Sequence, residues 1–135
     1  MTLENLVRIN QLKKEPPDRR EFEGLVHAAT DRLRDAQNTT LSFSSRFDLA
    51  YNAAHGLALA ALRAAGYRTD KRYIVFQCMV HSVGLDKARV RMFSVCHERR
   101  NRAEYEGILD EDERLLEELV SNTKVLLESV RQIHV

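Results

Sequence analysis

The stretch of sequence that decides the fold is SRFDLAYNAAHGLALAALRAA, residues 45–65. Apolar side chains recur in it at steps of three and four, as on one stripe of an amphipathic helix, and further apolar residues widen that stripe. Such broad apolarity indicates a helix that is buried on most sides. The many alanines allow a neighbour to approach closely. We therefore expect residues 45–65 to form the central helix, and Gly66 to end it in the left-handed conformation.

Segments on both sides of this stretch carry the same helical period. No segment shows the sustained alternation of period two that would indicate a half-buried strand. The sequence therefore predicts an all-α fold, an up-and-down bundle of four long helices with one or two short extra helices. The expected helices span residues 3–13, 18–37, 45–65, 73–83, 86–105 and 110–133.

Few residues in the sequence mark the ends of helices. The run Glu15-Pro16-Pro17 is the one strong break, and it stops the first helix. Asp110, followed three residues later by Glu113, resembles a capping box that opens the last helix. No linker or repeat divides the 135 residues, which are close to the length of one domain. We expect a single domain over residues 1–135, with a short N-terminal helix in residues 1–15 and the bundle in residues 18–133.

Composition and charge exclude several classes of protein. The 21 Lys and Arg and 20 Asp and Glu give a net charge of +1, so any nucleic-acid role must depend on a local patch. The start of the chain does not resemble a signal peptide. The most apolar stretch, residues 57–62, is far shorter than the about 20 residues that cross a bilayer. We expect a cytoplasmic protein with buried, reduced Cys78 and Cys96, no membrane contact, no metal and no cofactor.

The segment most informative about function is CHERRNRAEY, residues 96–105. On a helical wheel, Arg99 and Arg100 continue the direction of the preceding apolar stripe. Because burying an unpaired charge is costly, they must be paired or line a wet cleft, and Glu104, four residues after Arg100, can supply part of the pairing. Residues 86–105 hold six basic and three acidic side chains, a balance of +3, whereas residues 110–118 hold one basic and six acidic, a balance of −5. This polarity fits either a solvated charged turn or an anion-binding cleft whose arginines hold phosphate.

Residues 100–105 resemble the signature region of HEPN domains (higher eukaryotes and prokaryotes nucleotide-binding). In that family an arginine, often followed by Asn, precedes a histidine by four to six residues. Residues 45–55 and the Gly66-Tyr67 pair are similar to a helix and turn found in many of its members. The resemblance covers about residues 18–130. Arg100 matches the motif arginine and Asn101 the polar residue after it, whereas Tyr105 stands where a histidine is expected.

The resemblance implies a helical bundle, commonly dimeric, whose arginine motif lines a cleft at the dimer interface. Active members are metal-independent ribonucleases, many of them toxins of toxin–antitoxin pairs, and others accompany nucleotidyltransferases or bind nucleotides without cleaving them. A phenol, with a usual pKa of about 10, replaces an imidazole poorly as acid or base near neutral pH. It still offers a hydrogen bond and a stacking face. We therefore expect a homodimer that binds nucleotide or RNA and is not an efficient nuclease.

Two further hypotheses stay open. One is a metal-independent ribonuclease toxin, held by an antitoxin, in which Tyr105 or the nearby His97 replaces the usual histidine. The other is a structural or adaptor bundle that partners a nucleotidyltransferase. His97 is otherwise expected to face solvent and His55 to be structural. The predicted nucleotide- or RNA-binding residues are Arg99, Arg100, Asn101, Arg102 and Tyr105, the supporting residues are Arg46, Tyr51 and Glu104, and the candidates for a catalytic role are Arg100 and Tyr105.

Overall fold

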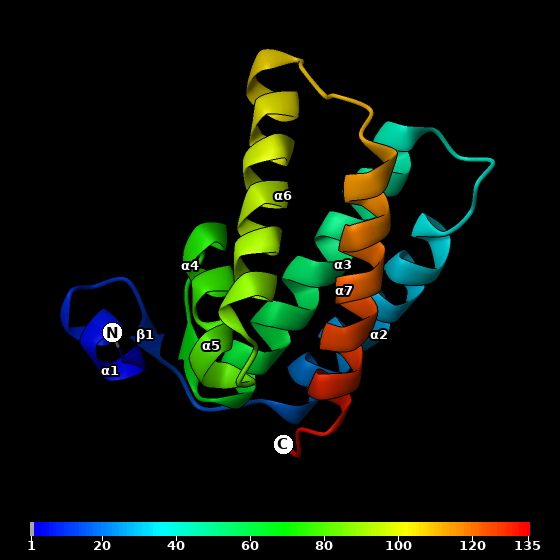
Figure 1. Ribbon diagram of the computed structural model, residues 1–135. Helices are drawn as coiled ribbons and strands as arrows, with labels where there is room; N and C mark the ends of the chain where they lie inside the picture. Colours follow the sequence, from blue (N-terminus) through cyan, green and yellow to red (C-terminus); the bar gives the residue numbers. More distant parts are fainter. Residues whose placement is uncertain (1) are drawn as a thin grey trace.

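The computed structural model describes residues 2–135 and confirms the predicted all-α bundle. Met1, which the predicted domain includes, lies outside the described residues. Within those residues the bundle is built from four long helices, as the periodicity of the sequence predicts (Figure 1). They are α2 (Arg19–Ala36), α3 (Phe43–Ala64), α6 (Lys87–Glu106) and α7 (Glu113–Arg131).

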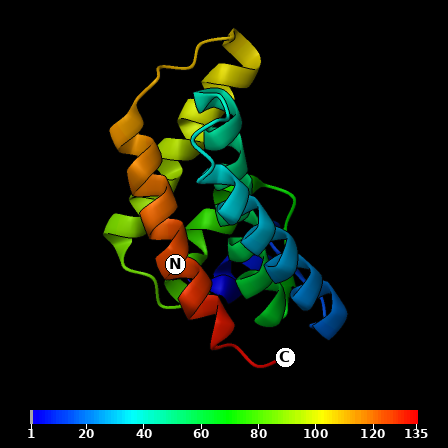
Figure 2. The ribbon, with the colours of Figure 1, turned by 90° about the vertical axis from the view of Figure 1, so that its right-hand side faces the viewer.

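Helix α3 is the central helix, and most of its residues are buried. Helices α2 and α7 pack along it (Figures 1 and 2). The approach of α2 is close: a methyl group placed on Gly56 would lie 3.7 Å from the Ala29 Cβ, an ordinary van der Waals distance. The small side chains of α3 therefore bring the neighbouring backbone near, as the sequence predicts.

The N-terminal segment differs from the prediction of one helix over residues 3–13. Helix α1 (Leu3–Arg8) ends earlier, and Asn10 takes a φ of 61° as the chain turns. The strand β1 (Lys13–Lys14) follows, and it pairs antiparallel with β2 (Tyr67–Arg68) after α3. A strand of two residues is too short to show an alternating pattern, so the sequence carries no local sign of this long-range pairing.

A buried arginine fastens this segment to the bundle. The side chain of Arg63, near the end of α3, is only 2% exposed. Its Nε donates to Glu21 Oε1 at 2.6 Å, and its Nη1 and Nη2 donate to the carbonyl oxygens of Glu15 and Pro16 at 3.0 and 2.8 Å. A guanidinium can be buried here because its N–H groups have partners on several sides.

Two other helix boundaries differ from those that the sequence predicts. The expected helix over residues 73–83 is divided into α4 (Arg72–Gln77) and α5 (Met79–Ser82). At the division the His81 N–H donates to the Cys78 carbonyl only three residues back, a tighter turn than an α-helix makes. The capping box of Asp110 with Glu113 is also wrong. Asp112 caps α7 by accepting from the Leu115 N–H at 3.0 Å.

Helix α6 is packed against the bundle over only part of its length. Its buried residues are Val90, Phe93 and Cys96, and no residue from 97 to 106 is buried. The helix ends at Gly107, whose φ of 69° is the left-handed conformation common after the last turn of a helix. The following loop leads back to α7 across the end of the bundle (Figure 1). The second half of α6 is thus the long helical segment with the least support.

Candidate functional site

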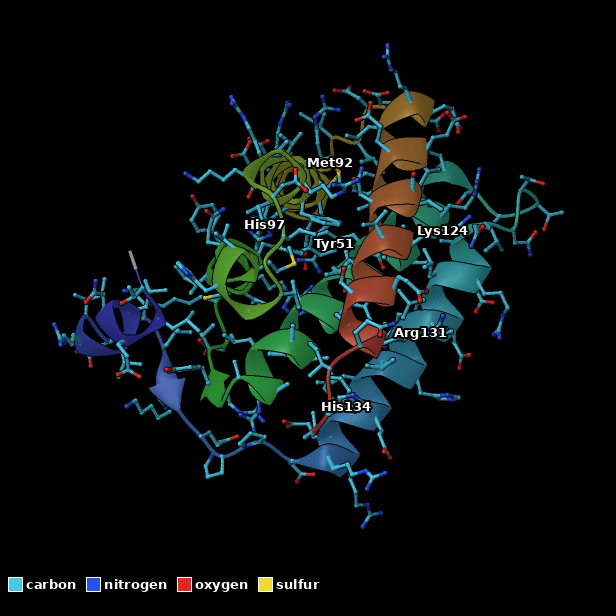
Figure 3. All side chains as sticks on the ribbon, turned by 60° about the horizontal axis from the view of Figure 1, so that its bottom comes forward. Tyr51, Met92, His97, Lys124, Arg131 and His134 are labelled. Atoms are coloured by element: carbon cyan, nitrogen blue, oxygen red, sulfur yellow. The ribbon has the colours of Figure 1, made fainter. Side chains whose placement is uncertain are left out.

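A cluster of polar and aromatic side chains lies between α3, α4 and α6. Tyr51 of α3 is completely buried, and its Oη lies 2.9 Å from His97 Nδ1 of α6. His97 Nε2 lies 3.2 Å from Asn101 Nδ2, one turn further along α6. Figure 3 shows Tyr51 and His97 next to each other in the space that the three helices enclose. We call this group the Tyr51–His97 cluster; its members are Tyr51, Asn52, Arg72, His97, Arg100 and Asn101.

Two arginines from different helices meet at the ring of Tyr51. The Cζ atoms of Arg72 and Arg100 lie 5.6 and 5.4 Å from the centroid of that ring, within the range of cation–π attraction. Arg72, at the start of α4, donates from Nη1 to Asn52 Oδ1 at 3.1 Å. Arg100 Nη1 lies 2.7 Å from Glu104 Oε2, which is the pair that their spacing of four residues predicts.

Burial and these two arginines decide the charges of the cluster. Desolvation first, and then Arg100 and Arg72, lower the pKa of His97 below its usual range. Burial, together with Arg72, His97 and Arg100, lowers the pKa of His55 to about 4. Burial raises the pKa of the Tyr51 hydroxyl. Near pH 7 both imidazoles and the phenol are therefore neutral, so the guanidinium groups supply the cluster's positive charge.

A hollow of about 340 Å³ opens beside the cluster. Arg100 reaches it and keeps 23% of its side chain exposed, so a ligand from solution has access to this guanidinium. Asp48 and Glu104 also line the hollow and lower its positive charge. Arg100 is thus both paired and placed at a wet cleft, the two arrangements between which the sequence left a choice. The lining residues are Ser44, Phe47, Asp48, Arg100, Ala103, Glu104 and Leu109.

The other predicted residues of α6 lie elsewhere. Arg99 Nη1 lies 4.0 Å from Asp112 Oδ2, toward the start of α7. Arg102 Nε lies 3.3 Å from Glu106 Oε2 on the exposed side of the helix. Tyr105 is 80% exposed. Since adjacent helical residues diverge by about 100°, neighbouring arginines do not converge on one ligand from a single helix.

Among the supporting residues, Tyr51 and Glu104 lie at the site, whereas Arg46 does not. Arg46 Nε donates to the Ala36 carbonyl at 2.9 Å and so joins the start of α3 to the end of α2. Its Nη1 also lies 4.0 Å from Glu113 Oε2. These contacts give Arg46 a structural role at the far end of α2.

The sequence did not predict Asn52 and Arg72 as members of the cluster, and it named His97 only as a replacement for the family's histidine. The expectation that His97 faces solvent is wrong, because its ring bonds Tyr51 and packs near Phe76, with ring centroids 6.2 Å apart. A usable signal was the spacing of four residues between His97 and Asn101, which places both on one helix face. Arg72 carried no signal, because only the packing of α4 against α3 brings it to Tyr51.

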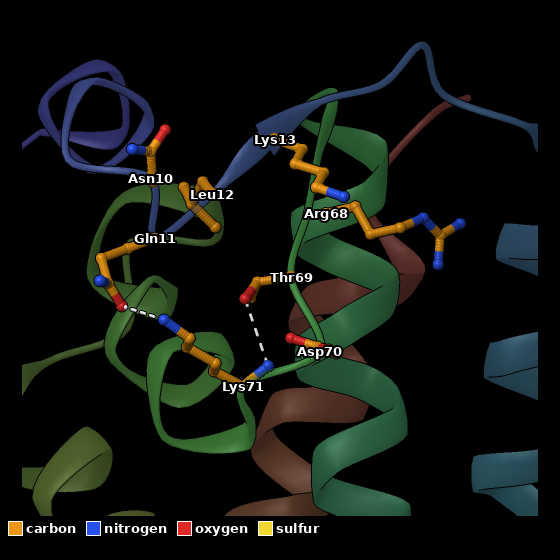
Figure 4. A pocket seen from close by; sticks show the side chains of 8 residues that line it. All are labelled: Asn10, Gln11, Leu12, Lys13, Arg68, Thr69, Asp70 and Lys71. Atoms are coloured by element: carbon orange, nitrogen blue, oxygen red, sulfur yellow. Dashed lines mark hydrogen bonds between the residues drawn. The ribbon is translucent and has the colours of Figure 1, made fainter.

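A second hollow, of about 300 Å³, lies where the N-terminal segment meets the chain after β2 (Figure 4). Two of the cations that line it are engaged within the chain. Lys71 Nζ donates to Gln11 Oε1 at 2.9 Å, and Arg68 bonds the carboxylates of Glu15 and Glu21. We therefore do not place the functional site there.

The two cysteines are free and buried. Burial raises the pKa of the Cys78 thiol to about 11 and that of Cys96 to about 12, so both are protonated at neutral pH. In the part of the chain that the structure describes, no three His, Cys, Asp or Glu side chains are grouped so as to hold a metal ion. The chemistry that the site offers is thus that of guanidinium, imidazole, phenol and amide groups.

Comparison of the chain with known proteins finds no matching family model, no matching curated protein and no matching solved structure. Over residues 2–135, none of the helices combines the length and the apolarity needed to cross a membrane. What the protein binds is therefore inferred from the Tyr51–His97 cluster and its surroundings.

Proposed function

We propose that this chain binds the phosphate groups of a nucleotide or an RNA at the Tyr51–His97 cluster. The observation that carries the proposal is the convergence of Arg72 and Arg100, from two helices, on the one ring of Tyr51. Within residues 2–135, Arg72 has an amide partner and no ion pair. Guanidinium groups suit phosphate because their planar forks donate two parallel hydrogen bonds. The HEPN resemblance supports the same site, since its motif residues Arg100 and Asn101 are members of the cluster.

The pair of Arg100 with Glu104 is compatible with an incoming phosphate. Glu104 is 48% exposed, so its carboxylate returns to water at little cost when phosphate takes its place. The variant Glu104→Gln removes this competitor and lowers the negative charge of the hollow. We expect it to bind RNA more tightly than the wild type, whereas Arg100→Ala binds less tightly.

The second half of α6, which contains no buried residue, supports a homodimer as the functional form. No residue from 97 to 106 is buried, and Tyr105 and Ile108 are exposed at the end of the helix. Helical segments of this length are marginal in water without tertiary packing. A second copy would cover these apolar side chains and set two clusters side by side. Light scattering across a range of concentrations tests this: the double variant Tyr105→Ser, Ile108→Ser should dissociate, and a wild type that stays monomeric throughout would contradict it.

Titration of a fluorescently labelled single-stranded RNA of 20 nucleotides, at several salt concentrations, tests the binding proposal. Removing one charge-assisted hydrogen bond, worth about 1.5–3 kcal/mol, should weaken binding about tenfold or more in Arg100→Ala and in Arg72→Ala. Each loss should also reduce the salt slope by about 0.7. The control Arg114→Ala removes the same charge from an exposed position on α7 and should bind normally. Equal binding by Arg100→Ala and Arg114→Ala would refute the site.

A ribonuclease activity is the second candidate, and the position of His97 favours it. This neutral imidazole lies three residues before Arg100, so the two groups share one side of α6. His97 would accept the proton of a ribose 2′-hydroxyl as the O2′–phosphorus bond forms. The phosphorus–O5′ bond breaks, and the departing O5′ takes a proton from water. The products are a 2′,3′-cyclic phosphate and a 5′-hydroxyl, and Arg72 and Arg100 stabilise the developing charge.

Incubation of RNA with the protein in excess EDTA tests the second candidate. Cleavage that yields cyclic phosphate ends, and that falls about 10²–10⁴-fold in His97→Ala, would establish it. Tyr105→Phe is the matched comparison, because it asks whether the residue in the family's histidine position takes part. Intact RNA after long incubation with the wild type would leave binding as the function.

A further inference from the structure

A groove between α4 and α6, which Val80 of α5 also lines, shares no lining residue with the hollow at Arg100. Its volume is about 360 Å³. Tyr73 of α4 forms one end of the groove and also packs against His97, with ring centroids 6.4 Å apart. The groove is therefore next to the Tyr51–His97 cluster, but separate side chains line it: Tyr73, Gln77, Val80, Lys87, Val90, Arg91, Ser94 and Glu98.

Tyr73 offers an aromatic face to solvent. The residue is 50% exposed, while the interior of the molecule holds most other aromatic rings. Its contact with His97 supports the ring from the protein side, at an interplanar angle of 47°. An aromatic ring held in this way is a platform on which a nucleobase can stack, with little loss of side-chain freedom on binding.

The opposite end of the groove carries two free cations. Lys87 and Arg91 lie one turn apart on α6, both are exposed, and neither has a salt-bridge partner in the described part of the chain. Glu98 would repel a phosphate, but it is seven residues beyond Arg91, about 10 Å along the helix. The charges therefore favour an anion near Lys87 and Arg91 and an uncharged ring at the end of the groove near Tyr73.

Polar groups between the two ends can meet the edge of a base. Gln77 Nε2 donates to Ser94 Oγ at 2.8 Å and so bridges α4 and α6 within the groove. The Gln77 amide keeps a second N–H and its carbonyl oxygen for a ligand. The groove thus combines a stacking face, hydrogen-bonding groups and cations, in that order.

We propose that the α4–α6 groove holds one nucleotide unit, with the base stacked on Tyr73 and the phosphate bound by Lys87 and Arg91. This inference deepens the proposed function. If the nucleotide unit is part of an RNA strand that continues to Arg100, the inference rests on that function. A free nucleotide presents the same base and phosphate. The experiment below separates these two sources.

Fluorescence anisotropy with a labelled single-stranded RNA of eight nucleotides measures the groove directly. Tyr73→Leu should weaken binding about tenfold, because one base–aromatic stack is lost, whereas Tyr73→Phe keeps the ring and should bind within about twofold of the wild type. Lys87→Gln with Arg91→Gln should also weaken binding, and the charge-matched pair Arg114→Gln with Lys124→Gln on α7 should not. An oligomer of abasic ribose phosphates should bind the wild type and Tyr73→Leu equally.

Competition with AMP and UMP identifies the source of the unit. Displacement of the RNA by mononucleotide, retained in Arg100→Ala, supports a free nucleotide as the ligand and counts against the proposed function at the cluster. Binding of the oligomer alone, lost both in Tyr73→Leu and in Arg100→Ala, supports a residue of a strand. RNA binding that is normal in Tyr73→Leu but lost in Arg100→Ala overturns the groove and leaves the cluster. If Tyr73→Leu changes only the self-association of the protein, the groove is a contact between protein molecules, and the proposal that it holds a nucleotide unit is wrong.

Discussion

The low pKa of His55 makes a quantitative prediction about stability in acid. In the unfolded chain this imidazole takes up a proton near pH 6.5, whereas in the folded protein it does so only near pH 4. Burial is the main cause, and Arg72, His97 and Arg100 face the ring from α4 and α6. Between these two values the unfolded state binds more protons, so the free energy of unfolding falls as the pH falls.

The size of this effect follows from the two pKa values. Each pKa unit is worth about 1.4 kcal/mol, so lowering the pH from 7.5 to 4.5 should remove about 2.5 kcal/mol of stability through His55 alone. Neither His55→Phe nor His55→Asn can take up this proton. In both variants the difference in unfolding free energy between the two pH values should therefore be smaller by about that amount, whatever their stability at pH 7.5.

Urea denaturation, followed by circular dichroism at both pH values, measures the effect. With a urea slope of about 1–3 kcal/mol per molar for a domain of this size, the acid shift of the midpoint should shrink by about one to two molar in the variants. The control His134→Asn changes an exposed histidine near the end of the chain and should leave the wild-type acid shift in place. Equal acid shifts in the wild type and both His55 variants would refute the buried, neutral imidazole.

Three further predictions concern the fold. Arg63→Met should destabilise the protein by about 3 kcal/mol, measured by urea denaturation at pH 7.5, because it leaves Glu21 Oε1 and the carbonyl oxygens of Glu15 and Pro16 without their donor; a loss below about 1 kcal/mol would contradict its anchoring role. Cys78 and Cys96 should react with iodoacetamide far more slowly in the folded protein than in urea, since both thiols are buried and protonated in the fold. Equal reaction rates in the two conditions, measured by mass spectrometry, would contradict this burial. Gly107→Ala should lower the free energy of unfolding by about 1 kcal/mol because of the positive φ at this position. Gly24→Ala, inside α2 with open space around it, should raise that free energy by about 0.5–1 kcal/mol. Unfolding temperatures that shift in the same direction in both variants would contradict this reasoning.

Periodicity predicts the long helices well, because their stability comes from one buried apolar face that the spacing of side chains reveals. The stripe within residues 45–65 marked α3 as the central helix, and the structure buries most of it. Shorter elements depend on partners far away in the chain. The pairing of Lys13 with Arg68, and the position of Arg63 against the carbonyls before α2, arise only when the two ends of that region meet.

The candidate site was predicted in part for the same reason. Residues on one helix can be sorted by angle, so the sequence showed that Arg100 continues an apolar stripe and can pair with Glu104. The sequence could not show that Arg72 from a separate short helix would meet Arg100 at Tyr51. Nor could it show that the buried hydroxyl of Tyr51, on α3, would bond the ring of His97.

The second half of α6, which contains no buried residue, has a consequence for the kinetics of the amide protons. Between residues 97 and 106 the backbone is held by helical hydrogen bonds with no buried side chain behind them, so these amides should exchange with deuterium early, long before those of α3. An occupant that joins Arg100 to Arg72 would add to the contact of His97 with Tyr51 and slow the exchange there. At a fixed protein concentration, a gain in protection of residues 97–106 on adding a candidate molecule therefore reports binding, and it can be used to screen molecules that are not yet known to bind.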